Sequence, residues 1–267
     1  MSGAAIAELR RALERALVSL GIGEPAGMRM QPSPYRTSFP LERVEVTLEG
    51  GKVLDLACKR LDWEGLEPAA RMAKPRFLHD PEREPAVYAE VLPQAPPGPP
   101  RCFGTVAEPG CHWLFLEQVE GRELFQVGER DLWEEAARWL ARFHVATAPD
   151  LDRHRVAGRL IDHDAAFYRQ WIERAEKFAS QRGDGSAAAV ARLRSHHDQA
   201  VEALLAQPRT VLHGEFYASN VLVAHPNCIK FSSSQRENSM QFGEAVRVAP
   251  VDWELSAVGP GLSDPLT

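Results

Sequence analysis

Two stretches, residues 209–223 (RTVLHGEFYASNVLV) and residues 248–254 (VAPVDWE), decide the fold of this chain. Their short β-branched and apolar runs predict three strands separated by polar loops. The first loop carries Glu215 and, five positions later, Asn220, and Asp252 follows the third strand. Neighbouring loops would therefore present two carboxylates and a carboxamide together. Such a set suits a site where one group orients a hydroxyl and two hold Mg²⁺.

The order and spacing of these motifs resemble those of a known enzyme family. The H-G-E at 213–215 with Asn220, followed by the D-W-E at 252–254, is similar to the H-G-D-x-x-x-x-N and D-W-E or D-x-D motifs of the aminoglycoside phosphotransferase family. In protein kinases the matching residues are the Asp and Asn of the catalytic loop and the Asp of D-F-G. Three unrelated polar loops on an α/β protein are the alternative.

The resemblance implies an α+β, bilobal, protein-kinase-like fold. A nucleotide-binding lobe with a leading helix, an antiparallel sheet and a further helix would span residues 1–119, and a mainly helical catalytic and substrate lobe would span residues 120–267. Family members usually continue into further C-terminal helices, whereas this sequence ends at Thr267. The resemblance therefore implies either a shortened member or a truncated chain, in which pocket or core surface would lie uncovered.

Composition and charge are typical of a soluble globular protein. The 267 residues are 44% apolar and 25% charged, carry a net charge of −6, and suffice for one large domain or two lobes. No basic stripe indicates a nucleic-acid partner. The four cysteines have no C-x-x-C spacing and indicate reduced thiols in a cytoplasmic protein. No signal sequence indicates secretion, and no apolar run of about 18 residues indicates membrane spanning.

The N-terminal half contains patterns typical of one helix and several strands. Leucines at helical spacing in residues 4–20 predict an amphipathic helix that packs on the first lobe, with a partner-binding helix as the alternative. Residues 93–100, which are rich in proline, predict a stiff surface connector. Alternating residues and turn signals predict strands at 28–30, 41–48, 53–59, 102–107 and 112–116.

Lys59 is the candidate phosphate-binding residue because it ends an apolar strand. A fixed ammonium there would contact the α- and β-phosphates of ATP. A lysine that snorkels from a strand end is the alternative. The resemblance supplies its partner, because Glu84 and Tyr88 match the family's E-x-x-x-Y register. Glu82 and Glu90 remain alternatives for this carboxylate.

Two further segments would complete the nucleotide site by the resemblance. The loop at 32–40 would cover the phosphates, and it contains no glycine, so backbone amides and the hydroxyls of Thr37 and Ser38 would face them. The residues after the strand at 112–116 resemble the family's hinge. There, backbone N–H and C=O groups of residues such as Gln118 and Val119 would pair with adenine.

Helical patterns cover much of the C-terminal half. They predict helices at 129–145, 165–180 and 186–205, and His144 in the first helix is predicted to be structural. The polar segment 225–245 is longer than the turn usual in the family and predicts a loop, with a substrate lid as the alternative. In the family, segments before the catalytic loop help to build the substrate pocket. Acidic residues there are candidates for substrate contact: Asp162, Asp164 and Glu173.

The resemblance assigns roles to the residues of the catalytic motifs. Asp252 and Asn220 would hold Mg²⁺, with Glu254 assisting, and Glu215 would orient the acceptor hydroxyl and take its proton late. His213 would be a structural pin for the loop. Glu215 stands where Asp is usual, and a displacement of roughly 1 Å can cost about 100-fold in rate.

The predicted function is an ATP- and Mg²⁺-dependent phosphotransferase that moves the γ-phosphate to a hydroxyl of a small molecule. A nucleotide-binding pseudokinase or regulatory protein with little turnover is the first alternative, and an incomplete product without an acceptor pocket is the second. Aminoglycosides, other antibiotics, choline-like alcohols and sugars are all compatible acceptors, because acceptor-reading residues lie outside the motifs. Neither a nucleic acid nor a membrane is an expected partner.

Overall fold

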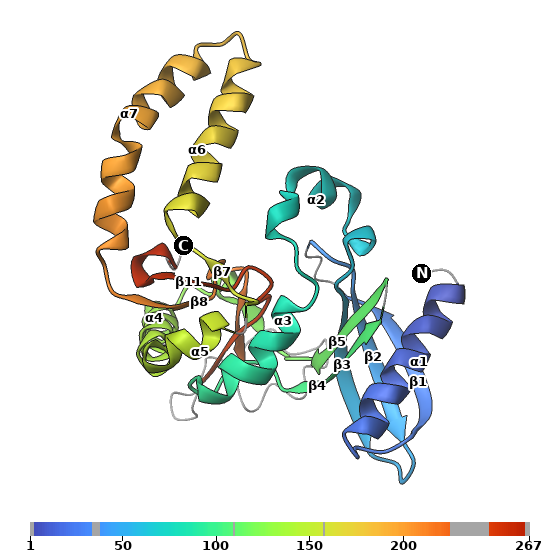
Figure 1. Ribbon diagram of the computed structural model, residues 1–267. Coiled ribbons are helices and arrows are strands. Elements are labelled where there is room, and N and C mark those ends of the chain that lie inside the picture. Colours follow the sequence, from blue (N-terminus) through green and yellow to red (C-terminus); the bar gives the residue numbers. More distant parts are fainter. Residues whose placement is uncertain (1–2, 34–37, 109, 157, 225–245, 265–267) are drawn as a thin grey trace.

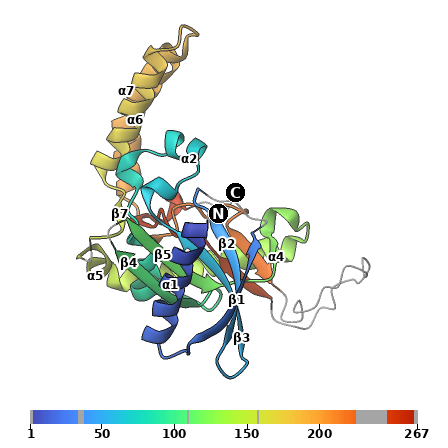
Figure 2. The same ribbon diagram turned by 90° about the vertical axis from the view of Figure 1, so that its right-hand side faces the viewer.

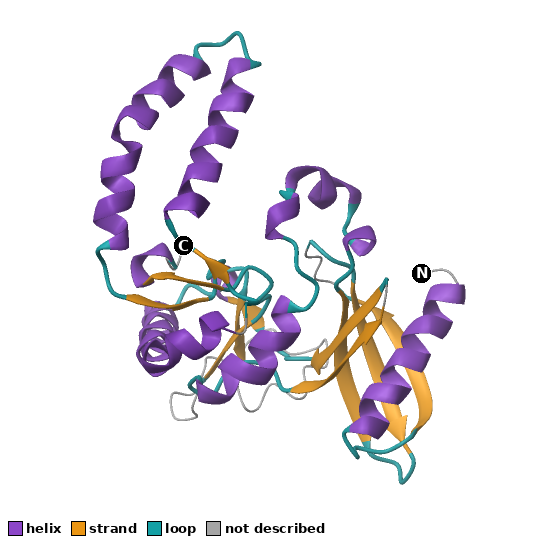
Figure 3. Ribbon diagram, viewed as in Figure 1, coloured by secondary structure: helices purple, strands orange, loops and turns teal. Residues whose placement is uncertain are grey.

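The computed structural model describes residues 3–33, 38–108, 110–156, 158–224 and 246–264 of the chain. They form two lobes of different composition, a sheet with helices followed by a mainly helical part (Figures 1 and 3). This arrangement agrees with the α+β, bilobal expectation. Within the described part of the chain, no helix is long and apolar enough to cross a membrane.

The N-terminal lobe is built on a five-stranded antiparallel sheet with the order β1-β2-β3-β5-β4. Each strand lies where the sequence predicts one, and Val44, Val46 and Leu48 alternate into the core because every second strand residue faces the same side. The strands are β1 (Pro25–Pro32), β2 (Leu41–Leu48), β3 (Val53–Arg60), β4 (Cys102–Glu108) and β5 (Cys111–Glu117).

Helix α1 (Gly3–Ser19) packs across this sheet (Figure 2). Its Leu9, Leu13 and Leu17 are fully buried and share one apolar cluster with Phe115 of β5. Burying one such leucine contributes roughly 1.5–3 kcal/mol. The apolar face of α1 therefore packs on the sheet of its own lobe, as the amphipathic pattern predicts.

Helical segments connect β3 to β4. After α2 (Pro68–Ala73), helix α3 (Arg83–Ala86) continues into a π-helical turn (Val87–Val91) and a 3-10 turn (Leu92–Gln94). The turn residues pack into a core that contains residues of both lobes. Because α3 begins at Arg83, Glu84 and Pro85 lie in its first turn, where proline is tolerated.

The proline-rich segment 93–100 lies at the surface, with Pro93 and Pro97 exposed, as its composition predicts, and it also contacts the second lobe. Its backbone carbonyls accept hydrogen bonds from the second lobe, Pro97 from Trp139 at 3.0 Å and Gly98 from Arg247 at 2.8 Å. A Cβ on Gly98 would lie 2.1 Å from the Val248 carbonyl oxygen. These hydrogen bonds hold the connector against the second lobe, which its composition does not reveal.

The C-terminal lobe combines helix α4 (Arg130–Thr147) and the short α5 (Leu151–Val156) with two small sheets. One sheet has the order β10-β9-β6, and the other has the order β7-β11-β8, in which β11 runs parallel to β7. Strand β11 lies in the terminal segment that sequence patterns left unassigned. The strands are β6 (Arg122–Glu123), β7 (Ile161–Asp162), β8 (Arg209–Leu212), β9 (Val221–Ala224), β10 (Arg247–Pro250) and β11 (Ala257–Pro260).

Helices α6 (Ala165–Ser180) and α7 (Ser186–Leu205) form a long hairpin that projects from the body of the lobe (Figures 1 and 2). Both helices lie where their patterns predict them. The carboxylate of Asp164 caps α6 by accepting a hydrogen bond from the Phe167 N–H at 2.8 Å. The N-terminal turns of α6 thereby have a fixed start at the base of the projection.

Candidate active site

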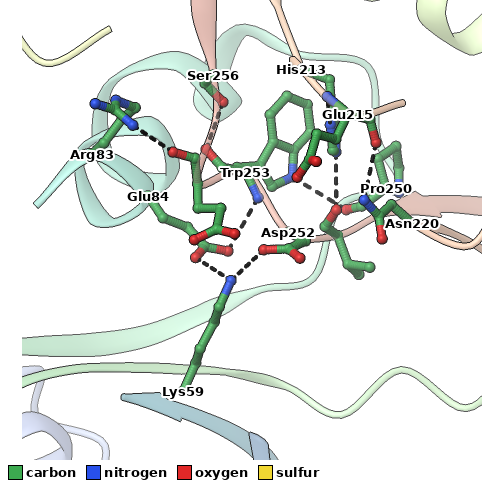
Figure 4. Close-up of polar contacts among 12 residues, drawn as sticks. Lys59, Arg83, Glu84, His213, Glu215, Asn220, Pro250, Asp252, Trp253 and Ser256 are labelled. Carbon is green, nitrogen blue, oxygen red and sulfur yellow. Dashed lines mark hydrogen bonds and ion pairs between the residues drawn. The ribbon is translucent and has the colours of Figure 1, made fainter. Parts of the chain in front are cut away.

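A buried lysine joins residues from three distant parts of the chain (Figure 4). The Lys59 Nζ, at the end of β3, lies 2.7 Å from Glu84 Oε2 and also donates to Asp252 Oδ1. Burial opposes the charge on Lys59, but Asp252 and Glu84 outweigh this effect, so the pKa of Lys59 is raised. The lysine side chain is only 4% exposed, which contradicts the alternative that it snorkels to solvent.

Glu84, rather than Glu82 or Glu90, is the carboxylate on Lys59. Its Oε1 also accepts a hydrogen bond from the Trp253 N–H at 3.2 Å. Glu82 instead pairs with Arg159, and Glu90 is exposed. Burial raises the pKa of Glu84, and Lys59 opposes that rise. The structure thus brings together the lysine, the helix carboxylate and the D-W-E backbone.

Asp252 has the single positive φ found for a non-glycine residue in the described chain, at +67°. This left-handed region costs a residue with a side chain about 1–3 kcal/mol at strained functional sites. Burial would raise the pKa of Asp252, but the ammonium of Lys59 outweighs it and lowers the pKa. A charged carboxylate held in a costly backbone conformation indicates a functional position.

The loop between β8 and β9 is shaped by a glycine and an amide. Gly214 has a φ of +90°, and a Cβ there would lie 2.2 Å from the Leu255 carbonyl oxygen, so the loop requires glycine. Asn220 Nδ2 donates to the backbone oxygen of Glu215 at 3.0 Å. The Val251 N–H donates to the backbone oxygen of Asn220 at 2.9 Å, which fixes Asn220 beside the residue that precedes Asp252.

Three carboxylates meet where this loop approaches the D-W-E segment. Glu215, Asp252 and Glu254 each offer an oxygen, and the three oxygens lie within 4.8 Å of one another. Burial, together with the charges of Asp252 and Glu254, raises the pKa of Glu215 to about 7. Carboxylate oxygens grouped in this way can hold a divalent cation.

A second buried ion pair, which the sequence did not predict, lies beside this cluster. Lys74 Nζ, just after α2, is 2.6 Å from Glu254 Oε2, and the two side chains are 9% and 7% exposed. Arg83, itself buried, donates to the backbone oxygen of Glu254 at 2.7 Å. Lys74 belongs to no recognisable motif, and its position between Lys59 and Glu84 is the only sequence signal for it.

Asp264 is a second unpredicted residue of the site, because sequence patterns left its segment unassigned. Its carboxylate accepts hydrogen bonds from the backbone N–H groups of His213, at 2.7 Å, and Gly214, at 3.0 Å. His144 lies 3.4 Å from the same carboxylate, and His213 contacts the Val251 carbonyl oxygen at 3.0 Å. These contacts agree with structural roles for both histidines.

The segment expected to form the hinge lies at the end of β5. The Gln118 N–H donates to the Asp55 carbonyl at 3.0 Å, so this N–H is used within the protein. Val119 is buried in a small apolar cluster with Leu222 of β9 and Ala249 of β10. The Val119 carbonyl accepts a hydrogen bond from the Gln118 side chain at 3.4 Å. Among the described hydrogen bonds, none involves the Gln118 carbonyl or the Val119 N–H, so these two backbone groups could pair with a ligand.

A cavity of about 400 Å³ lies next to Glu215, between residues of α2 and α6. Lys74, Glu254 and Ser38 also line it. Thr37, the other hydroxyl residue of the expected phosphate loop, lies outside the described residues, as does the segment 225–245.

The acidic residues considered for substrate contact lie elsewhere. Asp162 accepts a hydrogen bond from Arg209, Asp164 caps α6, and Glu173 is exposed on α6. None of the three is among the described residues that line the cavity. Capping and ion pairing therefore account for the first two of these carboxylates.

Comparison with known proteins agrees with this geometry. A family model described as "Phosphotransferase enzyme family" matches residues 71–230, which contain Glu84, Glu215 and Asn220. The chain is thus a member of the aminoglycoside phosphotransferase family. No curated protein matches the chain.

Two aminoglycoside phosphotransferases are among the solved structures that resemble the chain. An aminoglycoside-3'-phosphotransferase of type VIII has a TM-score of 0.50 at 18% identity, over 94% of this chain and 80% of that one. The aminoglycoside phosphotransferase APH(3'')-Id from Streptomyces rimosus ATCC10970, in complex with ADP and streptomycin, has a TM-score of 0.47 at 16% identity, over 92% and 77%. The first of these confirms the α+β, kinase-like fold expected from the motifs.

Proposed function

We propose that this protein transfers the γ-phosphoryl group of ATP to a hydroxyl of a small molecule. The observation that carries this proposal is the buried contact of Lys59 with both Glu84 and Asp252. It unites a strand lysine, a helix carboxylate and a strand-end aspartate, the parts that position phosphates and metal in kinase-like enzymes. Membership of the phosphotransferase family supports the same reaction class.

The nucleotide would be held by groups of the first lobe. Lys59 is a fixed cation for the α- and β-phosphates because its pKa is raised and its side chain is buried. Ser38 would offer its hydroxyl and backbone amide to the phosphates, as the resemblance implies, whereas Thr37 lies outside the described residues. The Gln118 carbonyl and the Val119 N–H offer the donor and acceptor pair that an adenine edge requires.

The carboxylate cluster fits a divalent magnesium ion. Oxygen donors are the ligands that Mg²⁺ prefers, and the cluster offers carboxylate oxygens within 4.8 Å of one another. Asp252 would bind the ion through its Oδ2, since Oδ1 accepts from Lys59, with Asn220 beside it and Glu254 assisting. When bound, Mg²⁺ supplies charge neutralisation for the phosphates.

Glu215 would orient the acceptor hydroxyl and take its proton. Its carboxylate lines the cavity, and burial raises its pKa to about 7, which suits a proton acceptor that works near neutral pH. As the acceptor oxygen bonds to phosphorus, the bond from phosphorus to the leaving oxygen of ADP breaks and the hydroxyl proton passes to a Glu215 oxygen. Glutamate in place of aspartate keeps the carboxylate at this position.

Phosphoryl transfer from labelled ATP to a panel of hydroxyl compounds tests the proposal. We expect label on at least one acceptor, in a reaction that requires Mg²⁺ and is lost in Glu215→Gln. Glu202→Gln on exposed α7 is the matched control and should keep full activity. Retained transfer in Glu215→Gln would refute the assignment of the proton acceptor, and MgATP binding without transfer to any acceptor would favour the regulatory alternative.

A further inference from the structure

The cavity beside Glu215 has two walls from different lobes. The first lobe contributes residues around α2 that include Lys74 and Leu78, and the second contributes Phe167 and Trp171 of α6 together with Tyr217. Its volume of about 400 Å³ lies within the range of small-molecule sites, roughly 300–1,000 Å³. Because Glu215 lines it, an acceptor hydroxyl in this cavity would lie within reach of the proposed proton acceptor.

The second wall is aromatic and still meets solvent. Trp171 is 38% exposed and Tyr217 is 44% exposed. Phe167 lies edge-on to Trp171 at a centroid distance of 6.3 Å, and Phe77 of the first lobe lies edge-on to Trp171 at 5.8 Å. Exposed aromatic side chains grouped around a cavity indicate a surface that a ligand covers. The contact between Phe77 and Trp171 extends this surface across both lobes.

The cavity offers little charge to a cationic ligand. Its charged lining residues, among those that the structure describes, are Lys74, Glu215 and Glu254. Lys74 and Glu254 pair with each other at 2.6 Å, which leaves the carboxylate of Glu215. His163 in the wall is neutral near pH 7 because burial lowers its pKa to about 4. A ligand with several ammonium groups could pair one of them with Glu215, but its other charges would lose hydration without a carboxylate partner, which is unfavourable.

We propose that the acceptor is a hydroxyl compound with a flat apolar ring and at most one positive charge, rather than a polycationic aminoglycoside. The ring would lie against Trp171 and Tyr217, and the hydroxyl would face Glu215. This inference rests on the proposed phosphotransferase function, because that function makes the cavity the acceptor site. Stacking on an aromatic side chain and burial of a phenyl ring together favour such a ligand.

Binding of matched probes tests the substrate class. The affinities of phenyl β-glucoside, methyl β-glucoside, choline and streptomycin would be measured by calorimetry in the presence of MgADP. Phenyl and methyl glucoside present the same hydroxyls and differ in the ring. We expect phenyl glucoside to bind at least about tenfold more tightly than each of the other three. Equal binding of the two glucosides, tighter binding of choline or streptomycin, or no binding of phenyl glucoside at millimolar concentration would overturn the proposal.

Variants on α6 assign the preference to the wall. Trp171→Ala should bring the affinity ratio of the two glucosides close to one, whereas Trp171→Phe should keep most of it. Phe178→Ala, an exposed residue of the same helix that does not line the cavity, is the matched control and should leave the ratio unchanged. A ratio unaffected by Trp171→Ala would contradict the assignment.

The outcome separates this inference from the proposed function. A protein that binds MgADP but prefers streptomycin refutes the ring-bearing acceptor alone. A protein that shows the ring preference but binds no magnesium nucleotide refutes the phosphotransferase proposal and leaves the ligand class standing.

Discussion

The buried pair of Lys74 and Glu254 gives a sharp prediction about stability. Its two side chains are 9% and 7% exposed, and the ammonium lies 2.6 Å from the carboxylate. Lys74→Met removes the cation and keeps most of the volume of the side chain. The carboxylate of Glu254 would then be buried without its partner. Leaving one member of a buried pair uncompensated costs about 3–5 kcal/mol, and we expect Lys74→Met to fall in this range.

A double-mutant cycle separates the lost pair from lost packing. Lys74→Met combined with Glu254→Gln removes both charges, so the double variant should be more stable than Lys74→Met alone. We expect a coupling energy of at least about 2 kcal/mol. The Lys74 ammonium also lies 5.3 Å from the centre of the Phe39 ring, and this cation–π contact contributes to stability as well. Lys74→Met removes the contact whether residue 254 is Glu or Gln, so the contact cancels from the coupling energy.

Urea unfolding at pH 7 measures these free energies. The matched control is Arg29→Met, which breaks the pair of Arg29 with Glu45 at 2.9 Å, where the side chains are 70% and 35% exposed. An exposed pair contributes about 0.2–1 kcal/mol. If Lys74→Met costs no more than Arg29→Met, or if the two substitutions at Lys74 and Glu254 are additive, the buried pair does not hold α2 to the D-W-E segment.

Three further predictions concern the catalytic loop. Without Mg²⁺, burial and the charges of Asp252 and Glu254 raise the pKa of Glu215 to about 7, so its carboxyl should titrate near pH 7 by ¹³C NMR of the metal-free protein, and a carboxyl that titrates at the ordinary value of about 4.5 would contradict its place in this cluster. Gly214→Ala should lower the free energy of unfolding by roughly 1–3 kcal/mol or more, because its φ is +90° and a Cβ would meet the Leu255 oxygen. Gly51→Ala shares a positive φ, +84°, without such a contact, so an equal loss in both variants would show that the close approach contributes nothing. Burial raises the pKa of Asp264, but the contacts from His144 and His213 outweigh this effect, so the pKa in the folded protein is lowered. The ionised Asp264 carboxylate therefore stabilises the folded state above the unfolded pKa of about 4, and this stabilisation is lost as the pH falls below that value. The stability difference between the wild type and Asp264→Asn, measured by urea unfolding, should therefore shrink below about pH 4, and a difference independent of pH would refute this role.

Sequence patterns predict those parts of the structure that local chemistry determines. The helices at 165–180 and 186–205 follow from apolar periodicity and from a turn that contains glycines, and the structure begins and ends them at these residues. The meeting of Lys59, Glu84 and Asp252 could be predicted because fixed motifs carry each residue. These residues are far apart in the sequence, and their proximity in the structure was predicted from the family resemblance.

Other parts of the site depend on contacts that have no fixed spacing. Lys74 and Asp264 belong to segments without a periodic pattern, and each gains its role from a partner in another segment. The proline content of segment 93–100 predicts a stiff surface connector, but it does not predict that Trp139 and Arg247 donate hydrogen bonds to its carbonyls. Hydrogen bonds to backbone groups leave no trace in the identity of the residue that accepts them.

Thermal unfolding with and without MgATP, beside Asp252→Asn, tests the central claim most directly. A ligand at 100 times its dissociation constant stabilises the folded state by about 2.7 kcal/mol, which raises Tm by several degrees in a protein of this size. The account predicts a rise that requires Mg²⁺, that Asp252→Asn loses and that Asp198→Asn, an exposed control on α7, retains. A cooperatively folded protein with no rise in Tm, or with a rise that Asp252→Asn leaves unchanged, would contradict the nucleotide and metal site built around Lys59 and Asp252.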